Sequence, residues 1–209
     1  MKDALAAKVW EAIKRHGLFE AGERVVVGVS GGPDSTALAH LLEADQGEMG
    51  LGLRLAHVNH GWRGPESDRD EQAARELAKR LGVPISVGRL ARGKSGPMRT
   101  EEGAREARYG FLRRVAGKAG AVKVAVGHTA DDQVETALLN LFRGGGPRGI
   151  AGMPWVKDGW LVRPLLGVWR VEVEGYCKRH RLGCVQDSSN LDERFARNWV
   201  RLRLLPLLQ

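Results

Sequence analysis

Short apolar runs alternate with longer amphipathic segments along most of this chain. The first run is almost pure valine, from Val25 to Val29. Runs of this length and composition are typical of strands that are buried on both faces of a parallel sheet. We therefore predict five strands, at 25–29, 53–60, 84–87, 121–127 and 160–166.

Helical spacing of apolar residues fills the segments between these runs. The opening helix places Leu5, Val9 and Ile13 on one face, and Gly17 is a candidate C-cap. Further helices are predicted at 36–42, 65–81, 100–117, 168–181 and after 194, with one more that starts within 128–136. This alternation predicts an α/β fold, a doubly wound and mostly parallel sheet with helices on both faces.

The whole chain, 1–209, is predicted to form one catalytic domain, because its length suits a single core and it contains no repeat or low-complexity tract. The last helix stays apolar to the end, so we expect it to lead into a further C-terminal region. Two arginine- and glycine-rich segments, 89–97 and 143–149, are predicted to be cationic loops that suit phosphate or an RNA backbone.

The first strand runs into a turn whose composition suits phosphate. Its residues are Ser30, Gly31, Gly32, Pro33, Asp34 and Ser35. Adjacent glycines let backbone N–H groups approach an anion, and the helix that follows adds free amides and the positive end of its dipole. No lysine occupies the place that a Walker A loop requires. The simpler alternative is a plain turn in which Asp34 caps the helix.

A second group of polar residues follows the fourth predicted strand. Asp132 and Glu135 share one face of a helix, close to His128. Capping of the helix by Thr129 and Asp132 accounts for the aspartate, but it requires neither Glu135 nor His128. Clustered carboxylates at this edge of the sheet suit either Mg²⁺ or the ammonium group of an amine substrate.

Two more sites are predicted less directly. The backbone near His57, at the end of the second strand, is a candidate contact for an adenine edge, and Arg63 is a candidate contact for phosphate. Packing of the histidine and solvation of the arginine are the alternative. Arg105, Arg108 and Tyr109 lie within one helical turn, and paired guanidinium groups next to an aromatic ring suit a phosphate and a stacked base. Ion pairs with the acids one turn earlier are the simpler alternative.

Charge and cysteine content narrow the class of protein. The formal net charge of +8 favours a polyanionic partner, most simply nucleic acid. Cys177 and Cys184 fit no common zinc or redox spacing, so free thiols and a cytoplasmic location are expected. No apolar run is long enough for a membrane span, and no signal-peptide core is visible. The oligomeric state stays open, a homodimer included.

Six motifs occur in an order that resembles the N-terminal domain of the tRNA(Ile)-lysidine synthetases, members of the ATP pyrophosphatase or PP-loop superfamily. Asn59 departs from this pattern, because the family usually has aspartate there. The motifs lie at 30–35, 57–61, 107–109, 127–136, 163–166, and 187–190 with Arg197 and Asn198.

The resemblance implies an ATP-dependent ligase. ATP would adenylate the C2 oxygen of the wobble cytidine in an isoleucine tRNA with a CAU anticodon, and pyrophosphate would leave. The amine of free L-lysine would then displace AMP to form lysidine. The 30–35 loop would hold the β- and γ-phosphates, and Asp34 would help to place Mg²⁺.

The resemblance also assigns the substrate side of the site. Asp132 and Glu135 would bind lysine beside His128. Arg108 would steady the cytidine or its phosphate. Arg197 would bind the adenylate or the carboxylate of lysine.

Other functions stay open beside this one. A tRNA thiolase of the same superfamily would need reactive cysteines, but Cys177 lies within a predicted helix and neither cysteine is expected beside the 30–35 loop. A non-catalytic RNA- or nucleotide-binding module also fits the basic charge. An amidotransferase-type synthetase is disfavoured, because no glutaminase segment precedes the first strand.

Overall fold

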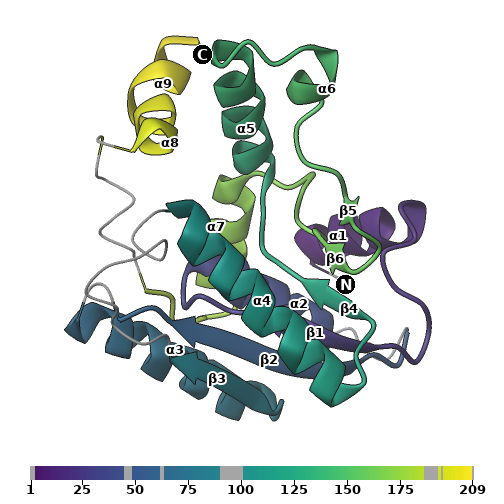
Figure 1. Cartoon of the computed structure of the whole chain (residues 1–209). Coiled ribbons are helices and arrows are strands. Elements are labelled where there is room, and N and C mark those ends of the chain that lie inside the picture. The colour runs from purple at the N-terminus through teal and green to yellow at the C-terminus, as the bar shows by residue number, and fades with distance from the viewer. Residues whose placement is uncertain are drawn as a thin grey trace.

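A parallel sheet forms the centre of the structure (Figure 1). The computed structural model describes residues 3–44, 49–61, 64–89, 101–185, 193 and 195–208. The strands are β1 (Arg24–Gly28), β2 (Gly52–Asn59), β3 (Ile85–Arg89), β4 (Lys123–Ala125), β5 (Val156–Lys157) and β6 (Leu161–Val162). They are ordered β3-β2-β1-β4-β6-β5, and only the β5–β6 pair is antiparallel.

Helices cover both faces of this sheet, as the alternating pattern predicted. They are α1 (Ala4–Arg15), α2 (Pro33–Ala44), α3 (Pro65–Leu81), α4 (Glu101–Ala119), α5 (Ala130–Phe142), α6 (Pro147–Ile150), α7 (Arg170–Arg179), α8 (Ala196–Trp199) and α9 (Leu205–Leu208), with a π-helical stretch (Val200–Leu204) between the last two. None of these described helices is both long and apolar enough to cross a membrane.

Strand β1 is the centre of two hydrophobic clusters because its side chains alternate between the faces. Val25 and Val27 join a large cluster with α1, α2, α3 and α7. Val26 points to the other face, where it packs with Leu112 and Val115 of α4. A strand that is buried on both sides explains why its sequence reads as an unbroken apolar run.

Three details differ from the predicted elements. Helix α2 begins at Pro33 rather than at residue 36, since proline is well suited to a first helical turn. The predicted loop at 143–149 contains the start of α6. The predicted strand at 160–166 is only two residues long, and it forms a hairpin with β5 that we did not predict.

The hairpin has a simple local cause. Asp158, Gly159 and Trp160 connect its strands, since Lys157 pairs with Leu161. Asp158 and Gly159 have φ values of 52° and 73°, and the Trp160 amide donates to the Lys157 carbonyl at 3.2 Å. An Asp-Gly pair with positive φ at both positions is a preferred sequence for the tight turn of a hairpin. Several predicted features lie outside the described residues, namely Arg63, the 187–190 motif and all but the first residue of the 89–97 loop.

The end of β4 packs closely on the start of α2. A Cβ atom added to Gly127 would lie 2.9 Å from the carbonyl carbon of Asp34 and from the amide nitrogen of Ser35. Glycine at this position therefore lets the segment after β4 approach the 30–35 loop. This contact brings together the two polar groups that were predicted from the sequence.

We expect Gly127→Ala to lower the free energy of unfolding by about 1–3 kcal/mol, because the new methyl group would overpack this contact. Gly117→Ala in α4 is the control, since a Cβ atom added there would meet nothing within 4 Å. The control should be neutral or gain up to about 1 kcal/mol from helix propensity. Urea denaturation measures both variants, and an unchanged stability of Gly127→Ala would contradict the close approach.

Candidate functional site

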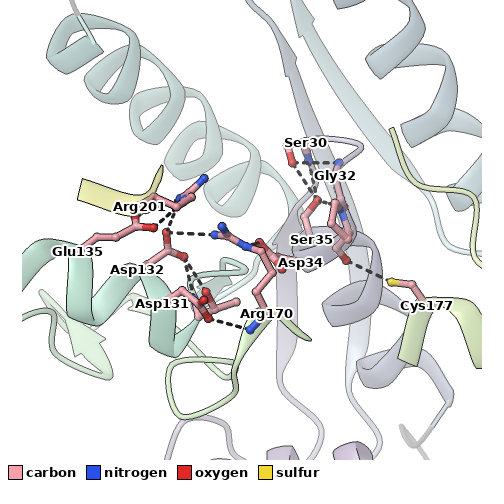
Figure 2. Close-up of polar contacts among 12 residues, drawn as sticks. Ser30, Gly32, Asp34, Ser35, Asp131, Asp132, Glu135, Arg170, Cys177 and Arg201 are labelled. Carbon is pink, nitrogen blue, oxygen red and sulfur yellow. Dashed lines mark hydrogen bonds and ion pairs between the residues drawn. The ribbon is translucent and has the colours of Figure 1, made fainter. Parts of the chain in front are cut away.

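The 30–35 loop between β1 and α2 is shaped by its own two serines (Figure 2). The amide of Ser30 donates to Oγ of Ser35 at 3.0 Å, and the two hydroxyl oxygens are also 3.0 Å apart. The amide of Gly32 donates to Oγ of Ser30 at 3.3 Å, and the Ser35 hydroxyl donates to the Gly32 carbonyl at 3.2 Å. The loop is therefore organised by side chain–backbone hydrogen bonds of its own.

Gly31 is required by both backbone conformation and space. Its φ is +95°, and a Cβ atom would lie 3.3 Å from the Asp70 carbonyl oxygen. Its own carbonyl accepts a hydrogen bond from the amide of Val185 at 2.9 Å. Beyond it, the amides of Asp34 and Ser35 lie in the first turn of α2, where helix geometry supplies no acceptor. Such amides at a helix start suit a phosphate group.

Asp34, in the first turn of α2, is a carboxyl group whose pKa is strongly raised. Burial raises its pKa to about 6, against the opposing effect of Arg170, while the charge of Asp132 raises the pKa further. Its Oδ1 atom is buried and has no hydrogen-bond partner among the described residues. A cation bound next to Oδ1 would stabilise the ionised form of the Asp34 carboxyl group.

The residues at this point fit a magnesium ion held jointly with phosphate. The described part of the chain contains no cluster of three or more acidic, histidine or cysteine side chains that could enclose a metal ion. Mg²⁺ commonly binds through one or two carboxylates together with phosphate oxygens and water. Asp34, next to a phosphate-suited loop, matches that pattern.

The start of α5 confirms the capping that we considered as the simple explanation for Asp132. Its Oδ2 accepts from the amide of Thr129 at 2.8 Å and from the Thr129 hydroxyl at 3.2 Å. Burial alone would raise the pKa of Asp132, but the Thr129 amide and the charge of Arg197 leave it below its ordinary value. Its other oxygen, Oδ1, lies 3.4 Å from Nη2 of Arg197.

Arg170 links the two predicted halves of the site. Its Nε atom lies 3.6 Å from Oδ2 of Asp34, and its Nη2 atom lies 3.8 Å from Oδ1 of Asp132. Its backbone amide donates to Oδ2 of Asp131 at 2.7 Å. Figure 2 shows the guanidinium group between the loop after β1 and the helix after β4. Asp34 and Asp132 therefore face one shared cation.

Sequence reasoning missed Arg170. One signal was available, since an arginine in the first turn of a predicted helix opposes the helix dipole unless acids lie nearby. The partners themselves could not be identified, because they come from segments far away in the chain.

Glu135 occupies a different environment from Asp132. Its side chain is fully buried. Oε1 accepts from Nε of Arg201 at 2.6 Å, and Oε2 accepts from Nε of Arg197 at 2.7 Å and from Nη2 of Arg201 at 3.0 Å. These bonds hold α8 and the π-helical stretch beside α5. Both oxygens of this predicted lysine ligand are thus bonded to arginines of the same chain.

His128 is held by a buried arginine that belongs to the 163–166 motif but had no predicted role. Nε of Arg163 donates to Nδ1 of His128 at 3.2 Å, and Nη1 donates to the Pro154 carbonyl at 2.5 Å. Burial holds the pKa of His128 well below its ordinary value, and the charge of Arg163 acts in the same direction. The imidazole is therefore neutral, with its proton on Nε2.

The other predicted contacts lie around His57 and around Tyr109. His57 is buried and its Nδ1 is bonded to the Val29 carbonyl at 2.9 Å, as the packing alternative expected. The guanidinium carbons of Arg105 and Arg108 lie 5.4 and 5.5 Å from the ring centre of Tyr109. Both guanidinium groups thus lie near the Tyr109 ring, and Arg108 is exposed.

One expectation about the cysteines is wrong. We did not expect them beside the 30–35 loop, but Sγ of Cys177 lies 3.6 Å from the carbonyl oxygen of Pro33. Cys177 does lie in a helix, α7, as predicted. That helix packs along α2, which begins inside the loop, so the two observations are compatible.

Relatives of known name are similar to this chain over nearly its whole length. A tRNA(Ile)-lysidine synthase of Dehalococcoides mccartyi (strain CBDB1) is 43% identical over 98% of this chain and 46% of that protein. One of Bacillus cereus (strain ATCC 10987 / NRS 248) is 40% identical over 100% of this chain and 45% of that protein. The chain spans less than half the length of these relatives.

Solved structures agree on the fold. A U34-tRNA thiolase of Methanococcus maripaludis, NcsA, matches with a TM-score of 0.71 at 18% identity, covering 98% of this chain and 78% of that one. An NH3-dependent NAD synthetase of Campylobacter jejuni matches with a TM-score of 0.54 at 14% identity, covering 97% and 86%. At such identities the likeness concerns the fold alone.

The family model described as the PP-loop domain matches residues 1–208. That span includes the serine-bonded loop, the Arg170 contact and the capped acidic helix. The chain belongs to the PP-loop domain family.

Proposed function

We propose that this chain carries out ATP-dependent ligation of lysine to C2 of the wobble cytidine in an isoleucine tRNA with a CAU anticodon. AMP and pyrophosphate are the other products. The proposal is supported by the relatives that are named tRNA(Ile)-lysidine synthases. The single structural observation that carries it is the position of Arg170 between Asp34 and Asp132.

This contact matters because the reaction has two charged partners. The leaving pyrophosphate needs N–H donors and a cation, which the 30–35 loop and Asp34 are suited to supply. The lysine ammonium group needs a carboxylate that lies close to the reacting cytosine of the tRNA. Asp34 and Asp132 lie close enough to share one guanidinium group, so both substrates would meet at one edge of the sheet.

The loop is suited to the first step of the reaction. Negative charge develops on the departing diphosphate, and amides that are already oriented stabilise it without reorganisation. Magnesium, when bound at Asp34, would neutralise charge on the phosphate oxygens. The neutral His128, whose Nε2 carries a proton, is a hydrogen-bond donor beside Asp132 rather than a base.

The two predicted lysine ligands are not equivalent. Asp132 is ionised, and the neighbours of its Oδ1 among the described residues are guanidinium groups at 3.4 to 4.0 Å, which a lysine ammonium could replace. Glu135 is saturated by shorter bonds from Arg197 and Arg201. We therefore assign cation binding to Asp132 and a positioning role, through the two arginines, to Glu135.

Incubation with ATP, Mg²⁺, lysine and the CAU isoleucine tRNA tests the function. We expect AMP release that depends on both lysine and tRNA, with lysidine detected in the tRNA by mass spectrometry. Absence of lysine-dependent AMP release while the tRNA is shown to be bound would favour a binding module instead. A Cys177→Ser/Cys184→Ser double variant should still form product, whereas a complete loss would favour thiol chemistry.

Asp34→Asn should abolish AMP release and yet stabilise the protein without ligands. Burial raises the pKa of Asp34 from 3.8 to about 6, so the ionised group destabilises the fold above that pH. The stability that protonated Asp34 contributes to the fold is fully present below pH 3.8 and is lost as the pH rises through about 6. At pH 8 the variant should gain on the order of 2 kcal/mol in unfolding free energy.

The measurement is urea denaturation at several pH values in the presence of a chelator. The advantage of Asp34→Asn should shrink toward zero near pH 4, where the wild-type group is itself largely protonated. A variant that is less stable than the parent at pH 8 would show that Asp34 supports the fold rather than the chemistry.

Asp132→Asn should raise KM for lysine by about 10- to 100-fold, the value of a lost charge-assisted hydrogen bond. Asparagine keeps an oxygen for the Thr129 amide, so the helix cap survives.

Glu135→Gln should leave KM for lysine within about twofold but destabilise the chain by several kcal/mol, since two partly buried arginines lose the charge of their fully buried partner.

Arg201→Met is the matched control for Glu135→Gln. If Glu135 acts through the arginines, both variants should lose stability and neither should change KM for lysine selectively. A selective rise of KM in Glu135→Gln alone would show that Glu135 itself binds lysine.

A further inference from the structure

Three guanidinium groups surround Asp132, and they are held in unequal ways. Arg197 and Arg201 are fixed by Glu135, whose carboxylate oxygens accept from them at 2.7 and 2.6 Å. Arg170 is held differently, because its ion pair with Asp132 is 3.8 Å long. At such a length the charges attract each other without forming a hydrogen bond. Of these three cations, Arg170 is therefore the one that a ligand can displace most easily.

The backbone of Arg170 is fixed although its side chain is loosely held. Its amide donates to Oδ2 of Asp131 at 2.7 Å, and the amide of Ala130 donates to the Val168 carbonyl at 2.8 Å. These two bonds tie the start of α7 to the start of α5. The Arg170 side chain is 22% exposed. Its guanidinium group can therefore change partners while the Cα atom stays in place.

The phosphate-suited loop lies within reach of the same guanidinium group. Nε of Arg170 lies 3.6 Å from Oδ2 of Asp34, which belongs to the first turn of α2 (Figure 2). The amides of that turn suit a phosphate group. A phosphate offers a guanidinium group two oxygens at once, and such charge-assisted pairs are stronger than long ionic contacts. A triphosphate in the loop is thus a better partner for Arg170 than either aspartate.

We propose that Arg170 is a displaceable counter-ion that makes lysine binding depend on the bound nucleotide. This inference rests on the proposed function. Without nucleotide, the guanidinium group neutralises Asp132 and competes with the ammonium group of lysine. The phosphates of ATP draw Arg170 away, and the lysine ammonium takes its place at Oδ1 of Asp132. Lysine therefore binds tightly only when ATP already occupies the loop.

The coupling between the two substrates must be reciprocal. If ATP raises the affinity for lysine by a given factor, lysine raises the affinity for ATP by the same factor. Direct attraction between the lysine ammonium and the ATP phosphates would also couple the two affinities. A variant that lacks the guanidinium group of Arg170 separates these two causes, because direct attraction does not need the arginine.

The first experiment measures the coupling in the parent chain by calorimetry. Lysine is titrated with and without the α,β-methylene analogue of ATP and Mg²⁺, with the CAU isoleucine tRNA present throughout. This analogue cannot be cleaved between its α- and β-phosphates, so no product forms. We expect lysine to bind about fivefold or more tightly with the analogue, the lower range of coupling between two sites.

The second experiment uses Arg170→Met, which should change the two affinities in opposite directions. Without the analogue, lysine should bind about fivefold or more tightly than it binds the parent, because the competing cation is gone. Addition of the analogue should then change the lysine affinity by less than about twofold. The analogue itself should bind about tenfold or more weakly, the value of a lost hydrogen bond to a charged group.

Two outcomes with this variant would overturn the inference. A merely structural role of Arg170 would weaken the binding of both ligands together. Full coupling that persists in Arg170→Met would assign the effect to direct attraction between lysine and phosphate. Arg170→Gln, which also lacks the positive charge, takes the place of the methionine variant if that variant does not fold.

Arg179→Met is the matched control, because it removes an arginine from the same helix. The Arg179 guanidinium group donates to Asp3, the N-cap residue of α1. Both affinities of this control should stay within about twofold of the parent. If it reproduced the changes expected for Arg170→Met, they would come from the packing of α7 and not from the charge beside Asp132.

The two proposals fail in distinguishable ways. Lysine that binds the parent chain equally well with and without the analogue would overturn the inference but leave the proposed function intact. Lysine-dependent AMP release by the parent chain tests the proposed function by itself. If neither this release nor any lysine binding is found, both proposals fail.

Discussion

The shared guanidinium group of Arg170 is the contact on which the arrangement of the site depends. Without it, Asp34 and Asp132 would face each other as like charges, and the charge of Asp132 already raises the pKa of Asp34. At 3.6 and 3.8 Å the contacts balance charge but are longer than good hydrogen bonds. A cation held in this way keeps the loop and the acidic helix together and can still be displaced by a substrate or a metal ion.

Glu135 is also neutralised by arginines, but by short hydrogen bonds rather than by long contacts. Its bonds to Arg197 and Arg201 are short, and the carboxylate is fully buried. Breaking such a pair leaves uncompensated buried charge, so it behaves as a fixed part of the fold. Acids only three residues apart on α5 thus separate into an adaptable group that faces the loop and a structural group that secures the C-terminal helices.

The parts of the fold that could be predicted are those whose sequence pattern continues over many residues or forms an unbroken apolar run. Helix α3 was predicted with its bounds, and Val25 to Val29 identified the central strand. The β5–β6 hairpin was missed because two-residue strands are too short for any periodicity, although Asp158-Gly159 was a usable turn signal.

Only about half of the site could be predicted, for a related reason. The loop and the acidic helix are continuous motifs, so their residues could be named in advance. Their partners are not local, since Arg197 and Arg201 lie 62 and 66 residues after Glu135. The family resemblance named Arg197 in advance, but not as a partner of Glu135. Charge pairing across a sheet edge is a property of the fold and becomes visible only with it.

Arg163 shows how the same fold also fixes a protonation state. It leaves the end of β6 fully buried, donates to the Pro154 carbonyl before β5, and donates to His128 after β4. A guanidinium group can only donate, so the imidazole atom that it meets must be the acceptor. The unpredicted hairpin thereby determines that the histidine beside Asp132 is a neutral donor. Chemistry at this edge depends on short strands as much as on the glycine-containing loop, because they hold the arginine that sets the tautomer.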